Sequence, residues 1–146
     1  YSVNPNCTII FTVSPVRHIK DGFVENQVSK ANLISALYTV LQVSPSGAEG
    51  AYFPSYEIMM DELRDYRFYA EDMLHPNPVA IDYIWERFKE TTISETAFST
   101  MAEVGNIQKS LSHRPFNPKS KSHLKFESKV REKIIKLENQ YSFMKF

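Results

Sequence analysis

The stretch CTIIFTV, Cys7 to Val13, decides how this sequence is expected to fold. It is short, β-branched and apolar, which predicts a buried strand in the centre of a sheet. Ser14-Pro15 ends the strand, because proline donates no hydrogen bond to a ladder. Val28 to Val43 then has the period of a helix, and Ala51-Tyr52-Phe53 is the next strand candidate. Strand, helix and strand in this order predict a parallel βαβ unit.

Helices are expected over most of the remaining chain. Their apolar side chains recur at three- and four-residue steps, the period of a helix with one buried face. Asn77 and Pro78 are typical of an N-cap followed by the first helical residue. The predicted helices are Val28–Val43, Tyr56–Tyr66, Pro78 to about Thr91, Ser94–Leu111 and His123–Tyr141, and the predicted loops include Arg17–Gln27, Ser44–Gly50 and Ser112–Ser120.

Two strands are too few for a stable doubly wound sheet. Either the fold is mainly helical, or further strands lie in a part of the protein before Tyr1. The chain has no initiator Met, which favours the second interpretation, namely that it is an excised piece of a longer protein. The last predicted helix carries an apolar stripe at near-heptad spacing, formed by Val130, Ile134, Leu137 and Tyr141.

Composition narrows the possible classes of function. The chain has 146 residues, enough for one compact domain with a core. Its 17 Lys and Arg balance its 17 Asp and Glu, which argues against a general polyanion binder and leaves a local basic patch open. No apolar run reaches the ~20 residues of a membrane span and no signal peptide is present, so a cytoplasmic location is expected. The single cysteine, Cys7, forms neither an internal disulfide nor a cysteine-based zinc site.

The stretch AEDMLHPNPVAIDYIWERF, Ala70 to Phe88, contains the main candidate for catalysis. Asp72 stands three residues before His75, and a turn can present both side chains to one side. A serine nucleophile needs an imidazole to take its proton, and the imidazole needs an acceptor that fixes its tautomer. Pro76 biases the backbone of His75 to extended conformations, which holds the ring outside the following helix. The same pattern also fits an ordinary acidic turn, because D-x-x-H is frequent by chance.

No residue of this chain is a convincing nucleophile. Ser14 follows a strand, but an elbow serine usually lends the next amide to the oxyanion hole, and Pro15 has no amide hydrogen. Cys7 lies at the start of its strand, away from the carboxyl end where ligands gather. Arg17 and His18 lie at that carboxyl end, where an arginine can bind a carboxylate or phosphate, and a loop salt bridge is the alternative.

Other residues have weaker interpretations. Two interpretations fit one group of residues equally well: they line a pocket, or they form an aromatic core with surface ion pairs. The group is Tyr52, Tyr56, Arg64, Arg67 and Tyr69. The four histidines, at 18, 75, 113 and 123, show no metal-ligand spacing, so no metal site is expected. The basic run from His113 to Lys125 is interpreted as a solvated loop and helix start, with phosphate or nucleic-acid contact as a minor alternative.

Three stretches resemble the GSCFA family, a branch of the SGNH/GDSL hydrolase superfamily. They are FTVSPVRHIKDGFVENQVSKANL (Phe11–Leu33), YFPSYEIMMDELRDYRFYAEDMLHP (Tyr52–Pro76) and VAIDYIWERF (Val79–Phe88). The unusual words SPVRH, DGF-x-EN, SKA, YFPSYE, DELRDYRFY and D-x-x-HP occur in this order, which makes the resemblance specific. The Gly-Ser-Cys-Phe-Ala stretch that names the family is not in this chain, so the resemblance implies that the nucleophile and early oxyanion-hole donors precede Tyr1.

The resemblance implies a fold and a set of roles. The fold class is α/β: a partial, flavodoxin-like three-layer α/β/α (SGNH-like) fold with few parallel strands and a mainly helical C-terminal region. Residues 1–92 would be the C-terminal part of the family domain, and residues 93–146 a helical extension. Asp72 and His75 would be catalytic. Substrate-binding roles are expected for Ser14, Arg17 and His18.

Two hypotheses of function follow. In the first, the chain is the C-terminal part of an SGNH-type esterase or acyl hydrolase, with a small acyl-ester or carbohydrate-ester substrate and no cofactor. The chain alone would be inactive, and neither a nucleic acid nor a membrane is expected as a partner. In the second, the helical C-terminal region, including the Val130–Tyr141 stripe, is a non-catalytic module for oligomerisation or partner binding. A homo-oligomer is possible in both.

Overall fold

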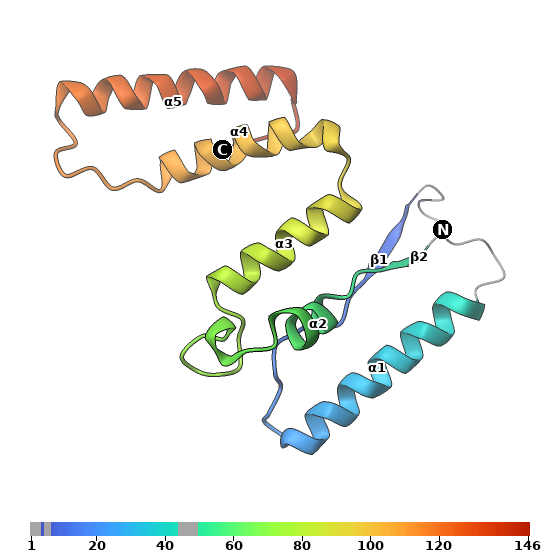
Figure 1. The fold of residues 1–146 in the computed structure, drawn as a ribbon. Helices are drawn as coiled ribbons and strands as arrows, with labels where there is room; N and C mark the ends of the chain where they lie inside the picture. The colour runs from blue at the N-terminus through green and yellow to red at the C-terminus, as the bar shows by residue number, and fades with distance from the viewer. Residues whose placement is uncertain (1–3, 5–6, 44–49) are drawn as a thin grey trace. The chain divides into compact units, whose positions relative to one another are not determined.

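A computed structural model describes residues 4, 7–43 and 50–146. The chain divides into two compact units, residues 1–92 and residues 93–146. It is a mixed α/β protein that is mostly helical (Figure 1). The first unit contains β1 (Ile9–Phe11), α1 (Phe23–Val43), β2 (Gly50–Tyr52), α2 (Ser55–Glu57), the π-helix η1 (Ile58–Leu63), the 3-10 helix η2 (Tyr66–Phe68) and α3 (Pro78–Thr92); the second contains the 3-10 helix η3 (Glu95–Ala97), α4 (Phe98–Leu111) and α5 (Lys121–Gln140).

The predicted βαβ unit is confirmed. β1 and β2 pair in parallel, with Ile9 opposite Gly50 and Phe11 opposite Tyr52, and α1 forms the crossover (Figure 1). Phe53 extends the pairing, since its N–H donates to the Phe11 carbonyl at 2.8 Å. Within the described ranges the sheet has these two strands only. The three-layer flavodoxin-like arrangement therefore stays a prediction.

The prediction of a buried central strand over Cys7–Val13 is wrong for this chain. Regular pairing covers Ile9–Phe11 only, and the side chains of Ile9 and Ile10 are 43% and 38% exposed. An apolar sequence indicates that a strand tends to be buried. Whether it is buried depends on which other elements pack against it. Val13, just past β1, is buried at 2% exposure, so the core begins where β1 ends.

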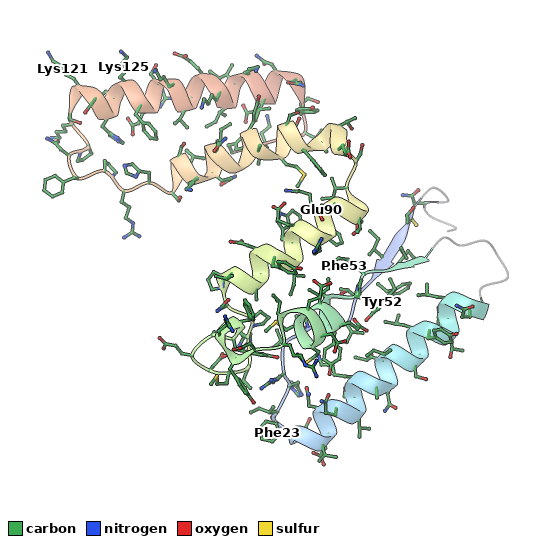
Figure 2. The ribbon with its side chains drawn as sticks, in the orientation of Figure 1. Phe23, Tyr52, Phe53, Glu90, Lys121 and Lys125 are labelled. Atoms are coloured by element: carbon green, nitrogen blue, oxygen red, sulfur yellow. The ribbon has the colours of Figure 1, made fainter. Side chains whose placement is uncertain are left out.

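α1 begins five residues earlier than the periodicity predicts. Gly22 has a φ of +117°, a conformation that glycine adopts easily, and its carbonyl accepts from the Asn26 N–H at 3.1 Å. The helix therefore starts directly after the Asp21-Gly22 turn, at Phe23, whose ring is exposed (Figure 2). The predicted loop Arg17–Gln27 is shorter for this reason. Of the predicted loop Ser44–Gly50, residues 44–49 lie outside the described residues, and Gly50 begins β2.

The predicted helix Tyr56–Tyr66 is irregular. α2 passes into the π-helix η1, where the Arg64 N–H donates to the Met59 carbonyl at 3.1 Å, and Arg64 ends it in a left-handed conformation with φ 50°. Met59 and Leu63 are buried in one cluster with Tyr69 and with Ala80 of α3. Side-chain periodicity does not distinguish a single π turn from an α turn, so this feature was not predictable.

α3 begins as predicted. The Asn77 carboxamide oxygen accepts from the Ala80 N–H at 3.1 Å, which makes Asn77 the N-cap and Pro78 the first helical residue. α3 is joined to the β2 end of the unit by aromatic packing. The Phe53 and Phe88 rings meet edge to face, with centroids 5.0 Å apart. This contact places the C-terminal part of α3 beside the residue that follows β2.

The second unit is an antiparallel pair of helices, α4 and α5 (Figure 1). The predicted helices Ser94–Leu111 and His123–Tyr141 are both found, with η3 in the first turn of one and a start at Lys121 in the other. The predicted apolar stripe of α5 packs onto α4 around Ile107, and Val130 and Leu137 are buried there. The stripe is therefore covered within its own unit, at least at Val130 and Leu137, and the oligomerisation hypothesis stays a prediction.

Candidate functional site

The Asp72–His75 pair lies on a loop that is closed at its base. The loop joins η2 to α3, and its two ends meet in an antiparallel bridge between Tyr69 and Pro76. At this base the Ala70 N–H donates to the His75 carbonyl at 2.8 Å. Met73, at the tip, has a φ of 60°, a left-handed conformation that is uncommon for a residue with a side chain. Backbone hydrogen bonds thus set the loop conformation, so the two side chains are held on a fixed turn.

Asp72 both orients the histidine ring and caps the turn. Its Oδ2 lies 2.6 Å from His75 Nδ1, within the range expected for a working pair. Its Oδ1 accepts from the N–H groups of Leu74 and His75, at 2.8 and 3.0 Å. These two backbone donors, followed by the His75 side chain, lower the pKa of Asp72 to about 2. The acidic-turn interpretation and the pair interpretation are therefore both satisfied by one carboxylate.

The hydrogen bond decides which nitrogen of His75 is free. An ionised carboxylate only accepts, so Nδ1 of His75 carries the proton and Nε2 of the neutral ring has the lone pair. Nε2 makes no hydrogen bond with any described residue, and the His75 side chain is 59% exposed. The ring is thus held in the tautomer that a general base requires, with its accepting nitrogen available.

Arg17 fastens this loop to the segment that follows β1. Its backbone N–H donates to the Leu74 carbonyl at 3.1 Å, and its Nη1 donates to the Met73 carbonyl at 3.4 Å. The guanidinium carbon lies 4.3 Å from the centroid of the Tyr69 ring. Arg17 is therefore in direct contact with the Asp72–His75 loop, and its two hydrogen bonds help to hold that loop in position.

The structure brings Ser14 near the same segment but occupies its hydroxyl. Its Oγ accepts from the Val16 N–H at 3.2 Å, and its carbonyl accepts from Lys30 Nζ at 2.6 Å. A hydroxyl used in a local turn before a proline fits the strand-terminator interpretation. His18 is different again: Nδ1 of its exposed ring lies 3.9 Å from an Asp21 carboxylate oxygen.

Two buried polar residues were missed as site supports. Lys30 is 8% exposed, its burial lowers the pKa of its ammonium, and its partner is the Ser14 carbonyl. Ser55 is 6% exposed and donates to the Val13 carbonyl at 2.8 Å. Both tie the chain just past β1 to helices distant in sequence. Lys30 and Ser55 lie in the stretches SKA and YFPSYE, which the resemblance to the family had already singled out.

A cavity of about 240 Å³ opens beside the fastened loop. Of the five residues that the sequence offered for a pocket, Arg64 and Tyr69 line it. Tyr52 instead hydrogen-bonds Glu57 at 2.8 Å, and Arg67 pairs with Asp65 at 3.0 Å. The cavity is lined by Arg17, Met59, Met60, Arg64, Asp65, Tyr66 and Tyr69.

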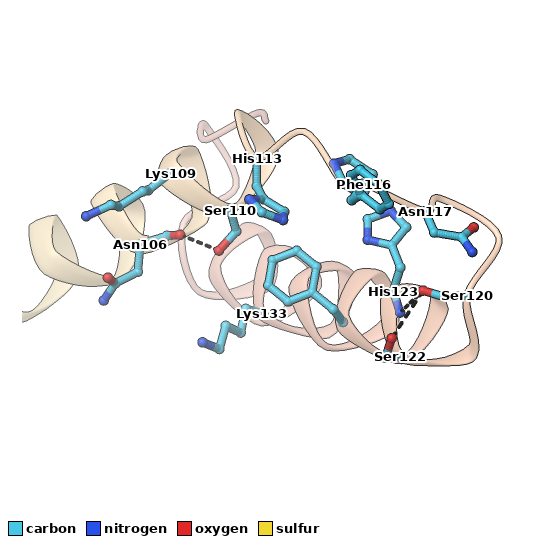
Figure 3. A pocket seen from close by; sticks show the side chains of 12 residues that line it. Asn106, Lys109, Ser110, His113, Phe116, Asn117, Ser120, Ser122, His123 and Lys133 are labelled. Atoms are coloured by element: carbon cyan, nitrogen blue, oxygen red, sulfur yellow. Dashed lines mark hydrogen bonds between the residues drawn. The ribbon is translucent and has the colours of Figure 1, made fainter.

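A larger cavity, of about 890 Å³, lies in the unit 93–146 (Figure 3). The rings of His113 and His123 lie 5.9 and 6.1 Å from the Phe126 ring, and His123 Nε2 is 3.2 Å from a Glu127 oxygen. The basic run does not converge on this cavity as a whole, since Lys121 and Lys125 point away from α4 (Figure 2). The lining is Asn106, Lys109, Ser110, His113, Pro115, Phe116, Asn117, Ser120, Ser122, His123, Phe126 and Lys133.

Neither a metal site nor a membrane span is found in the part of the chain that the structure describes. Residues 4, 7–43 and 50–146 contain no group of three or more His, Cys, Asp or Glu side chains arranged to hold an ion. Over the same residues, no helix combines the length and the apolar composition needed to cross a bilayer.

Comparisons with known proteins agree with the resemblance in the sequence. The model of the GSCFA family matches residues 1–88. A second model, described as the C-terminal domain of GSCFA domain proteins, matches residues 104–146. No curated protein and no solved structure matches the chain at a significant level. The first match ends inside α3, and the second covers α5 and the second half of α4.

Proposed function

This chain belongs to the GSCFA family, and we propose that it supplies the acid–base pair of a serine-type esterase or acyl hydrolase of the SGNH/GDSL kind. The observation that carries this proposal is the 2.6 Å contact between Asp72 Oδ2 and His75 Nδ1, on a loop set by backbone hydrogen bonds. His75 is the general base. Asp72 holds its tautomer and stabilises the imidazolium that forms. The serine nucleophile belongs to a part of the protein that precedes this chain.

The proposed reaction moves one proton through His75. His75 Nε2 takes the serine proton while the serine oxygen attacks the ester carbonyl, and the carbonyl π electrons move onto the oxygen. When the carbonyl re-forms, the bond to the alcohol oxygen breaks and the alcohol leaves with the proton from Nε2. A water molecule then repeats the sequence on the acyl-enzyme and releases the acid. Asp72 remains ionised throughout at neutral pH, since its pKa is about 2.

The substrate class is proposed on the same chemistry. A neutral imidazole with a serine partner suits an activated acyl group, so we propose a small acyl ester or a carbohydrate ester. No cofactor is needed for this sequence of steps. Ser14 is not proposed as the nucleophile, because its hydroxyl is hydrogen-bonded in a local turn and Pro15 offers no oxyanion-hole donor.

The proposal is tested in the longer protein that includes the preceding segment. Hydrolysis of a short-chain nitrophenyl ester is expected to fall ~10⁴-fold in both His75→Ala and Asp72→Asn, with a smaller change in KM than in kcat. His113→Ala, a histidine of the other unit, is the matched control and is expected to keep full activity. Full activity in His75→Ala would refute the proposal. The 146-residue chain by itself is expected to show no turnover.

The alternative function is a non-catalytic interaction module in residues 93–146. The α5 stripe no longer supports it, because Val130 and Leu137 are buried against α4. What remains in its favour is the open cavity of Figure 3, whose lining contains two lysines and no carboxylate. We rank this second, since the cavity does not hold a set of side chains arranged for one recognisable ligand.

A further inference from the structure

We propose that the cavity beside the Asp72–His75 loop recognises an anionic group, so that the ester hydrolysed by this family member carries a carboxylate or a phosphate. That the anion belongs to an ester substrate rests on the function proposed above, whereas the anion site itself is supported by separate observations. The site is formed by Arg17 and Arg64, which come from segments far apart in sequence, together with Tyr66 and Tyr69.

The charge of the two arginines is not neutralised by carboxylates. Arg17 contacts the Met73 carbonyl and the rings of Tyr66 and Tyr69, and no described carboxylate lies within ion-pair distance of it. Arg64 likewise forms no ion pair with any described residue. Asp65 is the acidic residue of the lining, and Arg67 already engages its carboxylate at 3.0 Å. Two arginines without carboxylate partners in the lining of one small cavity favour a ligand that brings the negative charge.

The backbone at Arg64 also distinguishes the site. Arg64 ends η1 with φ 50°, a position that glycine or asparagine usually takes. A residue with a long side chain costs more in this conformation, and such residues cluster at binding and catalytic sites. The preceding turn is a π-helix, a feature that is also frequent at functional sites. The chain therefore departs from regular helix geometry at the second arginine of the lining.

A polar atom still lacks a partner in the same lining. The Tyr69 hydroxyl is buried and makes no hydrogen bond with any described residue. Its ring lies under the Arg17 guanidinium. A buried hydroxyl without a partner is unfavourable, so the chain itself leaves hydrogen-bonding capacity unused at a residue of this lining.

The size of the cavity sets what it binds. About 240 Å³ is below the 300–1,000 Å³ typical of sites that enclose a whole ligand, and it suits a carboxylate or phosphate head group. Arg17 connects this head group to the chemistry, because the same residue holds the carbonyls of Met73 and Leu74, directly before His75. An ester anchored here would be positioned relative to the general base.

Binding is tested on the 146-residue chain by an NMR titration with succinate and with inorganic phosphate, followed through the amide signals of Arg17 and Leu74. Arg64→Asn removes the guanidinium and keeps a residue that tolerates the left-handed conformation. It is expected to weaken binding by ~10-fold or more, and Arg64→Lys by less. Arg87→Gln, the same loss of charge on α3, is the control and is expected to bind as the parent chain does. A stronger response to one of the two anions identifies the group.

The two proposals fail separately. Equal binding by Arg64→Asn and the parent chain, or no saturable binding by either, would overturn the anion site and leave the role of His75 untouched. Anion binding that is lost in Arg64→Asn, combined with full ester hydrolysis in His75→Ala of the longer protein, would overturn the proposed role of His75 and keep the anion site. In the longer protein, an ester with a free carboxylate is expected to exceed its neutral methyl ester in kcat/KM by ~10-fold, and Arg64→Asn is expected to remove this preference.

Discussion

Ser55→Ala tests whether the buried hydroxyl of Ser55 holds the end of β1 in place. Ser55 Oγ donates to the Val13 carbonyl at 2.8 Å and lies 2.6 Å from Thr12 Oγ1. Thr12 is exposed, so water replaces its lost partner. Val13 is 2% exposed, so its carbonyl loses a donor that water does not replace. One buried acceptor without a partner costs about 1–3 kcal/mol of unfolding free energy.

The measurement uses urea denaturation followed by the fluorescence of Trp85. It is the single tryptophan of the chain and stacks on Phe88, so its signal reports the unit 1–92. With an m value of roughly 1–2 kcal/mol per molar urea, the midpoint is expected to fall by about 1 M without a change in m. Ser35→Ala, an exposed serine of α1, is the control and is expected to change stability by less than about 0.5 kcal/mol. A Ser55→Ala variant as stable as this control would refute the reasoning.

Three further predictions concern the pair, the second unit and assembly. The amide signal of Leu74 should titrate with the Asp72 carboxyl near pH 2, its pKa in the folded chain. Because this pKa is lower than the ~3.9 of an unfolded chain, the carboxylate stabilises the fold above pH ~3.9, and this stabilisation is lost as the pH falls towards 2. Leu137 is 1% exposed, and Leu137→Ala should lower the free energy of unfolding of the unit 93–146 by about 2–5 kcal/mol, measured by circular dichroism. Ile135 is 51% exposed, and Ile135→Ala should lower it by less than about 1 kcal/mol. Light scattering at high concentration should show a dimer or larger species, and Ile10→Lys on the exposed edge should reduce it; a monomer in the parent chain would contradict this.

Features encoded within a few residues were predicted correctly from the sequence. The N-cap at Asn77 depends on one amide oxygen and an N–H three residues later. The contact of Asp72 with His75 is also an i, i+3 contact, and the local turn is sufficient to bring the two side chains together. The βαβ unit was recognisable because a short apolar run, a helical period and a second short run follow one another directly, and the parallel direction follows from the crossover.

The features that were missed depend on residues distant in sequence. Lys30 reaches the Ser14 carbonyl across 16 positions, and Ser55 reaches Val13 across 42, so neither partner can be inferred from spacing. Arg17 meets Met73 across 56 positions, and only the folded chain shows that the residue expected to bind substrate also holds the Asp72–His75 loop.

Coverage of the apolar surfaces was likewise a property of the fold. Ile9 and the stripe residue Leu137 are equally apolar in the sequence, yet Ile9 is 43% exposed and Leu137 is 1% exposed. Hydrophobicity is a property of one side chain, whereas burial is a property of everything that packs around it. The pair Asp72–His75 was therefore readable in the chain itself, and the cavity that joins Arg17 to Arg64 required the path of the whole unit.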